Sequence, residues 1–320
     1  MARFLITGAT GQVGSFVVEE GLRAGHVLSG TRGPRARPLP DGVLDAGAVS
    51  PDDACEAVRR AAEAMGGLDA VIHLAARSRA GASFNTPAAT FAHNANLGVA
   101  LVEAATDAGA RFVHASSAEI FAGTEAPLLT EDAALCPRSP YGVAKAAVHL
   151  YVQAAREGRG ATTTNVILFN AESERRPAEF VVSKIVRGLA AVKLGHEEAL
   201  HLGNTAAVRD FGHAADAARA LWIAATRAPA SDYVCATGEG HSVLELATLA
   251  CVHLGLDPAR VLRTEPSLLR PHDAPRLVGD ASRLRALGWA PRWRFDALVR
   301  SLVDHHLRAL STDGASKGRP

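Results

Sequence analysis

Residues 3–14 read RFLITGATGQVG, and this stretch decides the fold. A short aliphatic run is followed by glycines at positions 8, 11 and 14, and then by a helix-like segment over 15–24. Glycine at these positions allows a tight turn, close approach of backbone to a pyrophosphate, and close packing of helix on strand. Free N–H groups at the helix N-terminus then attract phosphate. The alternative is a purely structural turn. We predict dinucleotide contacts at Gly8, Thr10, Gly11, Gln12, Val13 and Gly14.

The alternation of strand and helix continues through the first half of the chain. Aliphatic runs at 70–74, 111–115 and 166–169 predict buried strands, and Ala-rich stretches at 52–65 and 94–108 predict helices between them. Such alternation indicates a parallel sheet covered by helices on both faces. We therefore predict a Rossmann-type, doubly wound α/β domain.

Beyond Asn170 the pattern loosens, and a second, smaller lobe is expected. Helices are predicted over 179–194, 216–225 and 243–254, with a short strand at 233–235. We assign residues 1–169 and about 208–235 to the Rossmann domain, and 170–207 with 236–310 to an interleaved α+β substrate lobe. The small, polar residues 311–320 predict a flexible tail.

Composition excludes several classes of protein. The 320 residues are 48% hydrophobic and 21% charged, which rules out a mainly disordered or fibrous chain. The formal net charge of +1 gives no global attraction to nucleic acid or to an anionic membrane. No apolar run is long enough for a signal peptide or a membrane span. The four cysteines lie far apart, which argues against a zinc site or a disulfide framework and favours the cytoplasm.

The end of the second strand bears on the choice of nicotinamide cofactor. An acidic residue there accepts hydrogen bonds from the ribose 2′-OH, whereas an arginine pairs with a 2′-phosphate. Residues 30–37 read GTRGPRAR and contain no acid. We therefore predict NADP rather than NAD, with Arg32 as the first phosphate ligand and Arg35 as the second. The alternative is a solvated basic loop.

A catalytic group is predicted where YGVAK, residues 141–145, places Tyr141 and Lys145 on one face of a helix. The lysine is expected to lower the pKa of the tyrosine, which would then take a hydroxyl proton. Ser117 and Glu119 follow the strand at 111–115, at the sheet edge where such folds build their sites. Ser117 could hydrogen-bond a substrate oxygen, and Glu119 could act as a general acid or base, unless it is a simple helix-capping acid.

Together these residues resemble the extended short-chain dehydrogenase/reductases and, more narrowly, the GDP-mannose 4,6-dehydratase family. The glycine turn and the Tyr–Lys pair are common to the superfamily. More specific are four stretches, at residues 168–176 (LFNAESERR), 202–213 (LGNTAAVRDFGH), 236–243 (ATGEGHSV) and 268–271 (LLRP).

The resemblance implies a dehydration with no net redox change, in which hydride leaves C4 of the sugar and returns to C6. Tyr141 would take the C4 hydroxyl proton, Glu119 would remove the C5 hydrogen, and Ser117 would help water to leave from C6. Arg175 and Arg176 are expected at an interface or surface. A homodimer or homotetramer is expected. The implied cofactor contacts are Leu74, Ala75 and Ala76, and the implied substrate contacts are Ser78, Ser83, Asn170, Lys184, Arg209 and Arg270.

Departures from the family pattern leave the identity of the substrate's sugar undecided. Ser117 stands where threonine is usual, Phe121 where tyrosine is usual, and Ala171 where histidine is usual. Further departures are Ala118, Glu174, Phe211, Arg77 and Arg79. One alternative is a 4-epimerase or 4-keto reductase of a nucleotide sugar, which needs no base at C5. Another is a dinucleotide sensor without catalysis, although this chain keeps Ser117, Tyr141 and Lys145.

Overall fold

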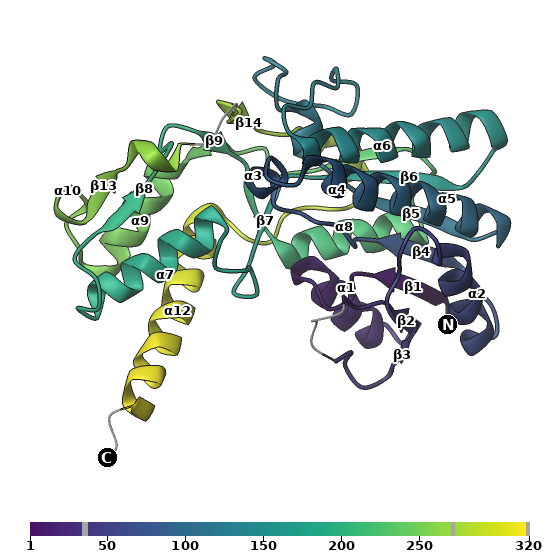
Figure 1. The fold of residues 1–320 in the computed structure, drawn as a ribbon, viewed down its shortest axis with the longest axis horizontal. Helices are drawn as coiled ribbons and strands as arrows, with labels where there is room; N and C mark the ends of the chain where they lie inside the picture. The colour runs from purple at the N-terminus through teal and green to yellow at the C-terminus, as the bar shows by residue number, and fades with distance from the viewer. Residues whose placement is uncertain (34–37, 270–272, 318–320) are drawn as a thin grey trace.

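The computed structural model describes residues 1–33, 38–269 and 273–317. Its centre is a sheet of seven parallel strands in the order β11-β6-β5-β4-β1-β2-β3 (Figure 1). The strands are β1 (Arg3–Thr7), β2 (Val27–Gly30), β3 (Val43–Asp45), β4 (Ala70–His73), β5 (Arg111–Ser117), β6 (Thr163–Leu168) and β11 (Asp232–Cys235). This order confirms the predicted Rossmann-type fold.

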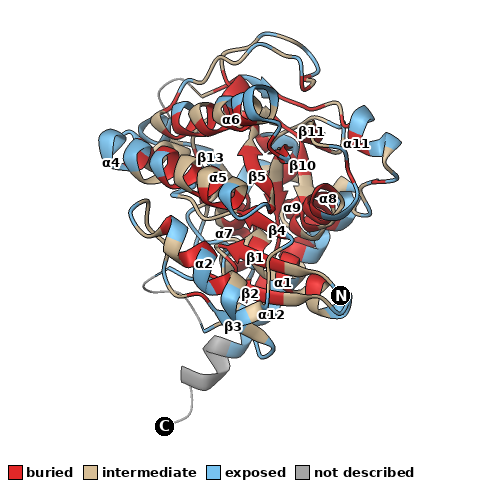
Figure 2. Ribbon diagram, turned by 90° about the vertical axis from the view of Figure 1, so that its right-hand side faces the viewer, coloured by how far each residue is buried: buried red, intermediate tan, exposed pale blue. Residues whose placement is uncertain are grey.

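Helices cover both faces of the sheet, and the buried residues concentrate on the strands (Figure 2). One face is packed by α1 (Gln12–Arg23) and α8 (Ala214–Thr226). The other is packed by α2 (Ala54–Met65), α5 (Leu97–Asp107) and α6 (Pro140–Arg159). Short connecting helices are α3 (Ala80–Ser83), α4 (Pro87–Phe91), the π-turn at Ala92–Asn96 and the 3-10 turn at Ala118–Phe121.

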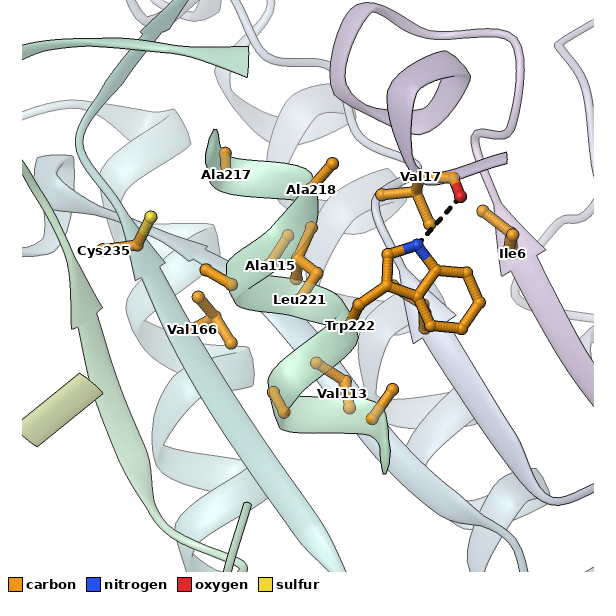
Figure 3. Packing of buried hydrophobic residues seen from close by; sticks show 14 of the residues in the cluster. Ile6, Val17, Val113, Ala115, Val166, Ala217, Ala218, Leu221, Trp222 and Cys235 are labelled. Carbon is orange, nitrogen blue, oxygen red and sulfur yellow. Dashed lines mark hydrogen bonds between the residues drawn. The ribbon is translucent and has the colours of Figure 1, made fainter. Parts of the chain in front are cut away.

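Packing between α1 and α8 sets the position of the glycine turn on the sheet. The indole N–H of Trp222 donates to the carbonyl oxygen of Val17 at 2.9 Å (Figure 3). Gly21 makes this contact possible, because a Cβ on it would lie 2.4 Å from the Trp222 ring. The ring of Phe4 meets the same indole edge-on, with centroids 4.7 Å apart. A mainly aliphatic core that includes the rings of Trp222 and Phe4 thus holds α1 against β1.

The second lobe lies beside the sheet domain and has its own core (Figure 1). That core joins α7 (Val181–Lys193), α9 (Val243–Leu254) and α12 (Phe295–Lys317). Smaller elements of the lobe are α10 (Pro258–Val261) and the 3-10 turn at Pro266–Leu268, whereas α11 (Ser282–Ala286) packs against β11 in the core of the sheet domain. Short strands complete the lobe and its connections: β7 (Asn170–Glu172), β8 (Leu200–Leu202), β9 (Val208–Arg209), β10 (Phe211–His213), β12 (His241–Ser242), β13 (Leu262–Thr264) and β14 (Arg276–Leu277).

The C-terminal segment differs from its sequence prediction. Helix α12 continues to Lys317, so most of the expected tail over 311–320 is helical rather than irregular. The hydroxyl of Ser311 donates to the carbonyl oxygen of Leu307 at 2.8 Å, which places this polar residue within the helix instead of ending it. In the part of the chain that the structure describes, no helix has the length and apolarity needed to cross a membrane.

Candidate active site

The glycine turn is too tight for side chains at its glycines. Gly8 has a φ of +71°, and a Cβ on it would lie 2.9 Å from the backbone nitrogen of Ala75. A Cβ on Gly14 would lie 2.1 Å from the carbonyl oxygen of Gly8. Helix α1 begins after Gly11 without a side-chain cap, as far as the described residues go, so its first N–H groups are available to a ligand. The residues present therefore fit a dinucleotide pyrophosphate.

Thr7, the last residue of β1, connects β1 with β4 at the point where the strand order of the sheet reverses. Its Oγ1 accepts the N–H groups of Leu74 and Ala75, each at 3.2 Å, and lies 2.8 Å from Nδ1 of His73. β1 and β4 lie side by side up to this point, and the strand order reverses between them, which is where sheets of this kind bind their ligands. Leu74 and Ala75 also touch the glycine turn at Gly8, so these predicted cofactor contacts, followed by Ala76 in the chain, lie beside it.

An acidic residue of β3, Asp45, lies beside the end of β2, where the sequence indicated none. Nε of Arg32 donates to Oδ2 of Asp45 at 3.0 Å, and the two side chains are 42% and 45% exposed. Asp45 ends β3, a strand that follows a proline-rich segment and that we did not predict. The acid absent from residues 30–37 thus comes from the next strand. Arg35 lies outside the described residues.

The four predicted catalytic residues come together where β5 ends and α6 begins. Ser117 is the last residue of β5, and its Oγ accepts the N–H of Glu119 at 3.3 Å. Tyr141 and Lys145 lie one helical turn apart on α6 and are 8% and 4% exposed. Hydrogen bonding to Ser117 lowers the pKa of Tyr141 and the charge of Glu119 raises it, so both groups lie near the phenol.

Burial dominates the acidity of the Tyr–Lys pair. It raises the pKa of Tyr141 to about 12, and the hydrogen bond to Ser117 offsets this only in part. Burial also lowers the pKa of Lys145 to about 7, while Nζ donates to the carbonyl oxygen of Ala115 at 2.7 Å. The predicted lowering of the tyrosine pKa is therefore wrong for the protein alone. The burial that disfavours the phenolate also disfavours the ammonium that would stabilise it.

Gln12 connects the glycine turn to the second lobe. Its Nε2 donates to the carbonyl oxygen of Ala171 at 2.9 Å and to Oγ of Ser173 at 3.0 Å. Its Oε1 accepts a hydrogen bond from Nη1 of Arg176 at 2.8 Å. The charge of Arg176 in turn lowers the pKa of Tyr141. One loop residue thus links the cofactor side of the site with the lobe expected to hold the substrate.

Arg175 extends this contact along α1. Its Nη1 donates to Oγ of Ser15 at 2.9 Å and lies 2.6 Å from Oε1 of Glu19, while its guanidinium lies 3.9 Å from the ring centroid of Phe16. We expected Arg175 and Arg176 at an interface or surface. They lie at an interface within the chain, between the lobe and α1, and Arg176 also reaches the site.

The predicted substrate contacts nearest the sheet are Ser78, Ser83 and Asn170, and they differ in exposure and in hydrogen-bond partners. Ser78 is exposed in the loop after β4. Ser83 is 1% exposed, and its Oγ accepts the backbone N–H of Tyr141 at 3.2 Å, so it braces the start of α6. Asn170 begins β7, and its Nδ2 donates to Oε1 of Glu172 at 3.3 Å.

Two further predicted substrate contacts, Lys184 and Arg209, lie in the second lobe. Lys184 is half-buried on α7. Arg209 donates to the carbonyl oxygens of Val208 and Ala274, each at 2.8 Å, and pairs with Asp273 at 2.8 Å. It therefore anchors the chain directly after residues 270–272. Arg270 lies outside the described residues.

Comparison with known proteins gives a consistent family. The family model for GDP-mannose 4,6 dehydratase matches residues 55–302. GDP-mannose 4,6 dehydratase 1 of Arabidopsis thaliana is 34% identical over 323 residues, covering 95% of this chain and 89% of that protein. GDP-mannose 4,6-dehydratase of Yersinia enterocolitica is 30% identical over 349 residues, covering 95% and 93%. The match to GDP-mannose 4,6 dehydratase 2 of Arabidopsis thaliana, at 38%, spans 75% of this chain and 66% of that protein.

Solved structures agree on the fold. UDP-glucose 4-epimerase of Thermus thermophilus in complex with NAD superposes with a TM-score of 0.83 at 27% identity, covering 95% of this chain and 98% of that one. dTDP-glucose 4,6-dehydratase of Bacillus anthracis, also with NAD, gives a TM-score of 0.83 at 16% identity, covering 97% and 98%.

Proposed function

The chain belongs to the GDP-mannose 4,6-dehydratase family, and we propose on this basis that it converts GDP-mannose to GDP-4-keto-6-deoxymannose with the help of NADP. It is a hydro-lyase of nucleotide sugars. The observation that supports the proposed reaction most directly is the grouping of Glu119 with Ser117 and Tyr141, since a carboxylate beside the phenol supplies the base that elimination requires.

The proposed proton transfers balance within the site. A bound nicotinamide would supply the acceptor for the C4 hydride and the source of the hydride at C6. Tyr141 takes the proton of the C4 hydroxyl, which leaves a ketone and makes the C5 hydrogen acidic. Glu119 removes that hydrogen and passes a proton to the C6 hydroxyl, which leaves as water with help from Ser117. Tyr141 then returns its proton to C5, so the net change is the loss of one water.

Lys145 controls whether Tyr141 can begin this sequence. The pair must lose one proton before the phenol can act as a base, and the depressed pKa of Lys145, about 7, allows this near neutral pH. The remaining proton must then lie on the lysine nitrogen and not on the phenol oxygen. Ser117 and Arg176 support this distribution, because both lower the pKa of Tyr141.

The alternative reactions differ in their need for Glu119. A 4-epimerase or a 4-keto reductase transfers hydride and proton at C4 and needs no base at C5. A dinucleotide sensor needs no complete Ser–Tyr–Lys set, yet this chain has Ser117 at the end of β5 and Tyr141 and Lys145 on α6. Glu119 therefore favours dehydration.

Incubation with GDP-mannose and a catalytic amount of NADP⁺ tests the proposal. Mass spectrometry should detect a nucleotide sugar lighter by one water, with no net formation of NADPH. Loss of water from UDP-glucose or dTDP-glucose instead would overturn the substrate and keep the reaction. A product of unchanged mass with an inverted C4 would replace the dehydratase by an epimerase.

Selectivity for NADP is proposed to rest on Arg32, oriented by Asp45. We expect Arg32→Ala to weaken NADP⁺ about 10- to 100-fold, the size of one or two lost charge-assisted hydrogen bonds. NAD⁺ affinity should change little, since it has no 2′-phosphate. Asp45→Asn removes a carboxylate that competes with the phosphate and should not weaken NADP⁺. Calorimetric titration of both cofactors checks this, and an equal loss for NAD⁺ would contradict it.

We assign substrate binding to the second lobe, with Asn170, Lys184 and Arg270 as ligands. The ion pair between Arg209 and Asp273 supports a shared role, because it holds the segment that follows Arg270. Bidentate arginines suit a pyrophosphate. The four cysteines are free thiols, which supports the cytoplasm as the proposed location.

A homodimer is proposed to form through α4 and α6. An apolar groove of about 640 Å³ lies between them, lined among others by Phe91, Pro137, Pro140 and Val143. Phe91 and Val143 are 41% and 44% exposed, which is unusual for adjacent large apolar side chains on one face. A second copy of the same face would bury both sets together.

We expect Val143→Glu to convert the dimer to a monomer of about 33 kDa. Light scattering after size exclusion measures the mass. Leu244→Glu is the matched control, because Leu244 is 48% exposed on the second lobe. A wild-type chain that is already monomeric would refute the proposed dimer.

A further inference from the structure

A row of buried imidazoles lies beneath Lys145. His73 on β4, His114 on β5 and His149 on α6 are each at most 1% exposed. His73 and His114 are partners in the sheet, with ring centroids 5.5 Å apart. His149 follows Lys145 by one helical turn, and its Nδ1 lies 3.1 Å from Oγ of Ser116. The layer between the sheet and α6 thus contains three imidazoles, two on strands and one on the helix, that the proposed reaction does not use.

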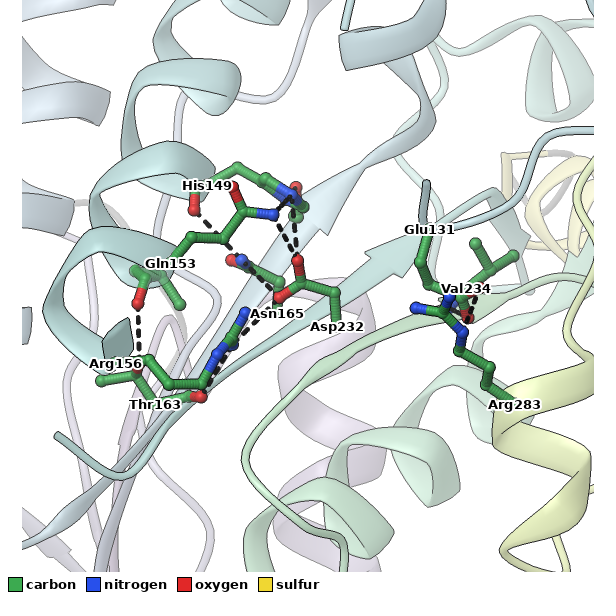
Figure 4. Close-up of polar contacts among 11 residues, drawn as sticks. Glu131, His149, Gln153, Arg156, Thr163, Asn165, Asp232, Val234 and Arg283 are labelled. Carbon is green, nitrogen blue, oxygen red and sulfur yellow. Dashed lines mark hydrogen bonds and ion pairs between the residues drawn. The ribbon is translucent and has the colours of Figure 1, made fainter. Parts of the chain in front are cut away.

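The outer two imidazoles have polar partners. Thr7 Oγ1 accepts two backbone N–H groups, so its own hydrogen is directed to Nδ1 of His73. His149 Nε2 lies 3.5 Å from the carboxylate of Asp232, which also accepts hydrogen bonds from Gln153 and Arg156 (Figure 4). His149 and Gln153 hold the pKa of Asp232 well below its usual range despite burial. The contact with Thr7 makes Nδ1 of His73 the hydrogen-bond acceptor of that ring.

His114 differs from both neighbours. It is 0% exposed, and neither of its ring nitrogens has a hydrogen-bond partner among the described residues. Burial, and next the charge of Lys145, lower its pKa well below the usual range. His114 is therefore neutral at physiological pH, and its acceptor lone pair lies within electrostatic reach of the lysine. A buried polar group without a partner is costly and points to an additional contact, such as an internal water.

Lys145 has unused donors next to this ring. Its ammonium carries three N–H groups, and the acceptor that the described residues give it is the carbonyl oxygen of Ala115 at 2.7 Å. Ala115 directly follows His114 in β5. The carbonyl that accepts from Lys145 and the ring with an unused acceptor thus belong to adjacent residues of β5, and the charge of Lys145 acts on that ring.

We propose that His114 is a positioning residue that accepts a hydrogen bond from Lys145 through one internal water and so keeps the working proton on the lysine. The inference rests on the proposed function and deepens it. Once the Tyr–Lys pair has lost a proton, the remaining proton can lie on the phenol oxygen or on the amine nitrogen. Acceptors around the nitrogen favour the second arrangement, in which Tyr141 is the base.

The other charged groups near the Tyr141–Lys145 pair have electrostatic effects on Tyr141 and on His73. Glu119 and Arg176 act on the phenol of Tyr141. His93 acts on His73. Among the described residues, the carbonyl oxygen of Ala115 accepts from the Lys145 ammonium, and the neutral rings of His73 and His114 interact electrostatically with it.

Replacing His114 should change the pH profile in a distinctive way. In the plot of kcat against pH, we expect His114→Leu to lower the plateau about tenfold. We also expect the acid limb of this plot to shift to lower pH by up to about one unit. Both effects follow because the substitution destabilises every form with a charged lysine, while the unproductive form with neutral lysine and neutral phenol is unaffected. His114→Gln keeps an acceptor and should restore both plateau and limb.

A second readout needs no substrate. The chain has three tyrosines, so the near-ultraviolet absorbance of the Tyr141 phenolate can be isolated by subtracting the Tyr141→Phe spectrum. With NADP⁺ bound, His114→Leu should lose most of this signal and His114→Gln should retain it. If wild type fails to dehydrate GDP-mannose, the proposed function fails, and this titration still tests His114.

His26→Leu is the matched control, because its Nδ1 also lacks a partner among the described residues while its ring stacks on Trp222, away from the pair. It should leave the pH profile and the phenolate signal unchanged. Equal loss of kcat in His114→Leu and His114→Gln with an unmoved acid limb would reduce His114 to a packing role and overturn the proposal. So would an unchanged phenolate signal in His114→Leu.

Discussion

Glu119→Gln should stop the reaction after oxidation at C4. The amide keeps the size of the side chain but cannot remove the C5 hydrogen or pass a proton to the leaving C6 hydroxyl. We expect the rate of water loss to fall about 10²- to 10⁴-fold, the usual contribution of a positioned general acid or base. Tyr141 and Lys145 remain, so a burst of NADPH absorbance should still follow addition of substrate to the loaded enzyme.

The burst of NADPH absorbance distinguishes a specific loss of elimination in Glu119→Gln from general damage to the site. Glu125→Gln, six residues along the chain and exposed, is the matched control and should behave as wild type. Binding of NADP⁺ should be unchanged in both variants. Full dehydration by Glu119→Gln would show that another group removes the C5 hydrogen, and loss of the burst would assign Glu119 to oxidation instead.

Lys145→Met should be inactive and yet more stable than wild type. Burial moves the pKa of Lys145 from 10.5 to about 7, so the folded state binds this proton less tightly than the unfolded state. The corresponding cost near neutral pH has a ceiling of about 5 kcal/mol. Methionine fills the space without charge and loses the hydrogen bond to Ala115, which offsets about 1 kcal/mol. We expect a net gain of about 2–4 kcal/mol in the free energy of unfolding.

The pH dependence of this gain carries a definite sign. Below about pH 7 both folded and unfolded states hold the proton, and the full cost of burying the charge is present. As pH rises from about 7 toward 10.5, the cost declines, and the two proteins should converge. Denaturant unfolding at both ends of this range measures the difference.

Lys193→Met, at an exposed lysine, should change stability by less than about 0.5 kcal/mol throughout. A Lys145→Met protein that is less stable than wild type below pH 7 would contradict the assignment of Lys145 as a costly buried base.

Local chemistry made several parts of the site predictable. The three glycines imply their own turn, because Gly8 has a positive φ and Gly14 touches the backbone of Gly8. The spacing of Tyr141 and Lys145 implies one helix face. Strand–helix alternation implies the parallel sheet, whose carboxyl edge brings Ser117 and Glu119 to that face.

Other parts depended on contacts between distant segments. Asp45 reaches Arg32 only because β3 pairs with β2, and Arg176 reaches Gln12 only because the lobe packs against α1. Neither pair has a spacing in sequence that could indicate it.

The amino-acid sequence by itself therefore predicted the fold, the glycine turn and the grouping of Ser117, Glu119, Tyr141 and Lys145, since each depends on neighbours along the chain or on strand order. Only the tertiary structure decided the protonation of that group. Burial from all sides raises the pKa of Tyr141 and lowers that of Lys145, and it leaves His114 neutral and without a partner among the described residues. Desolvation depends on every element packed around a side chain, and no local motif encodes it.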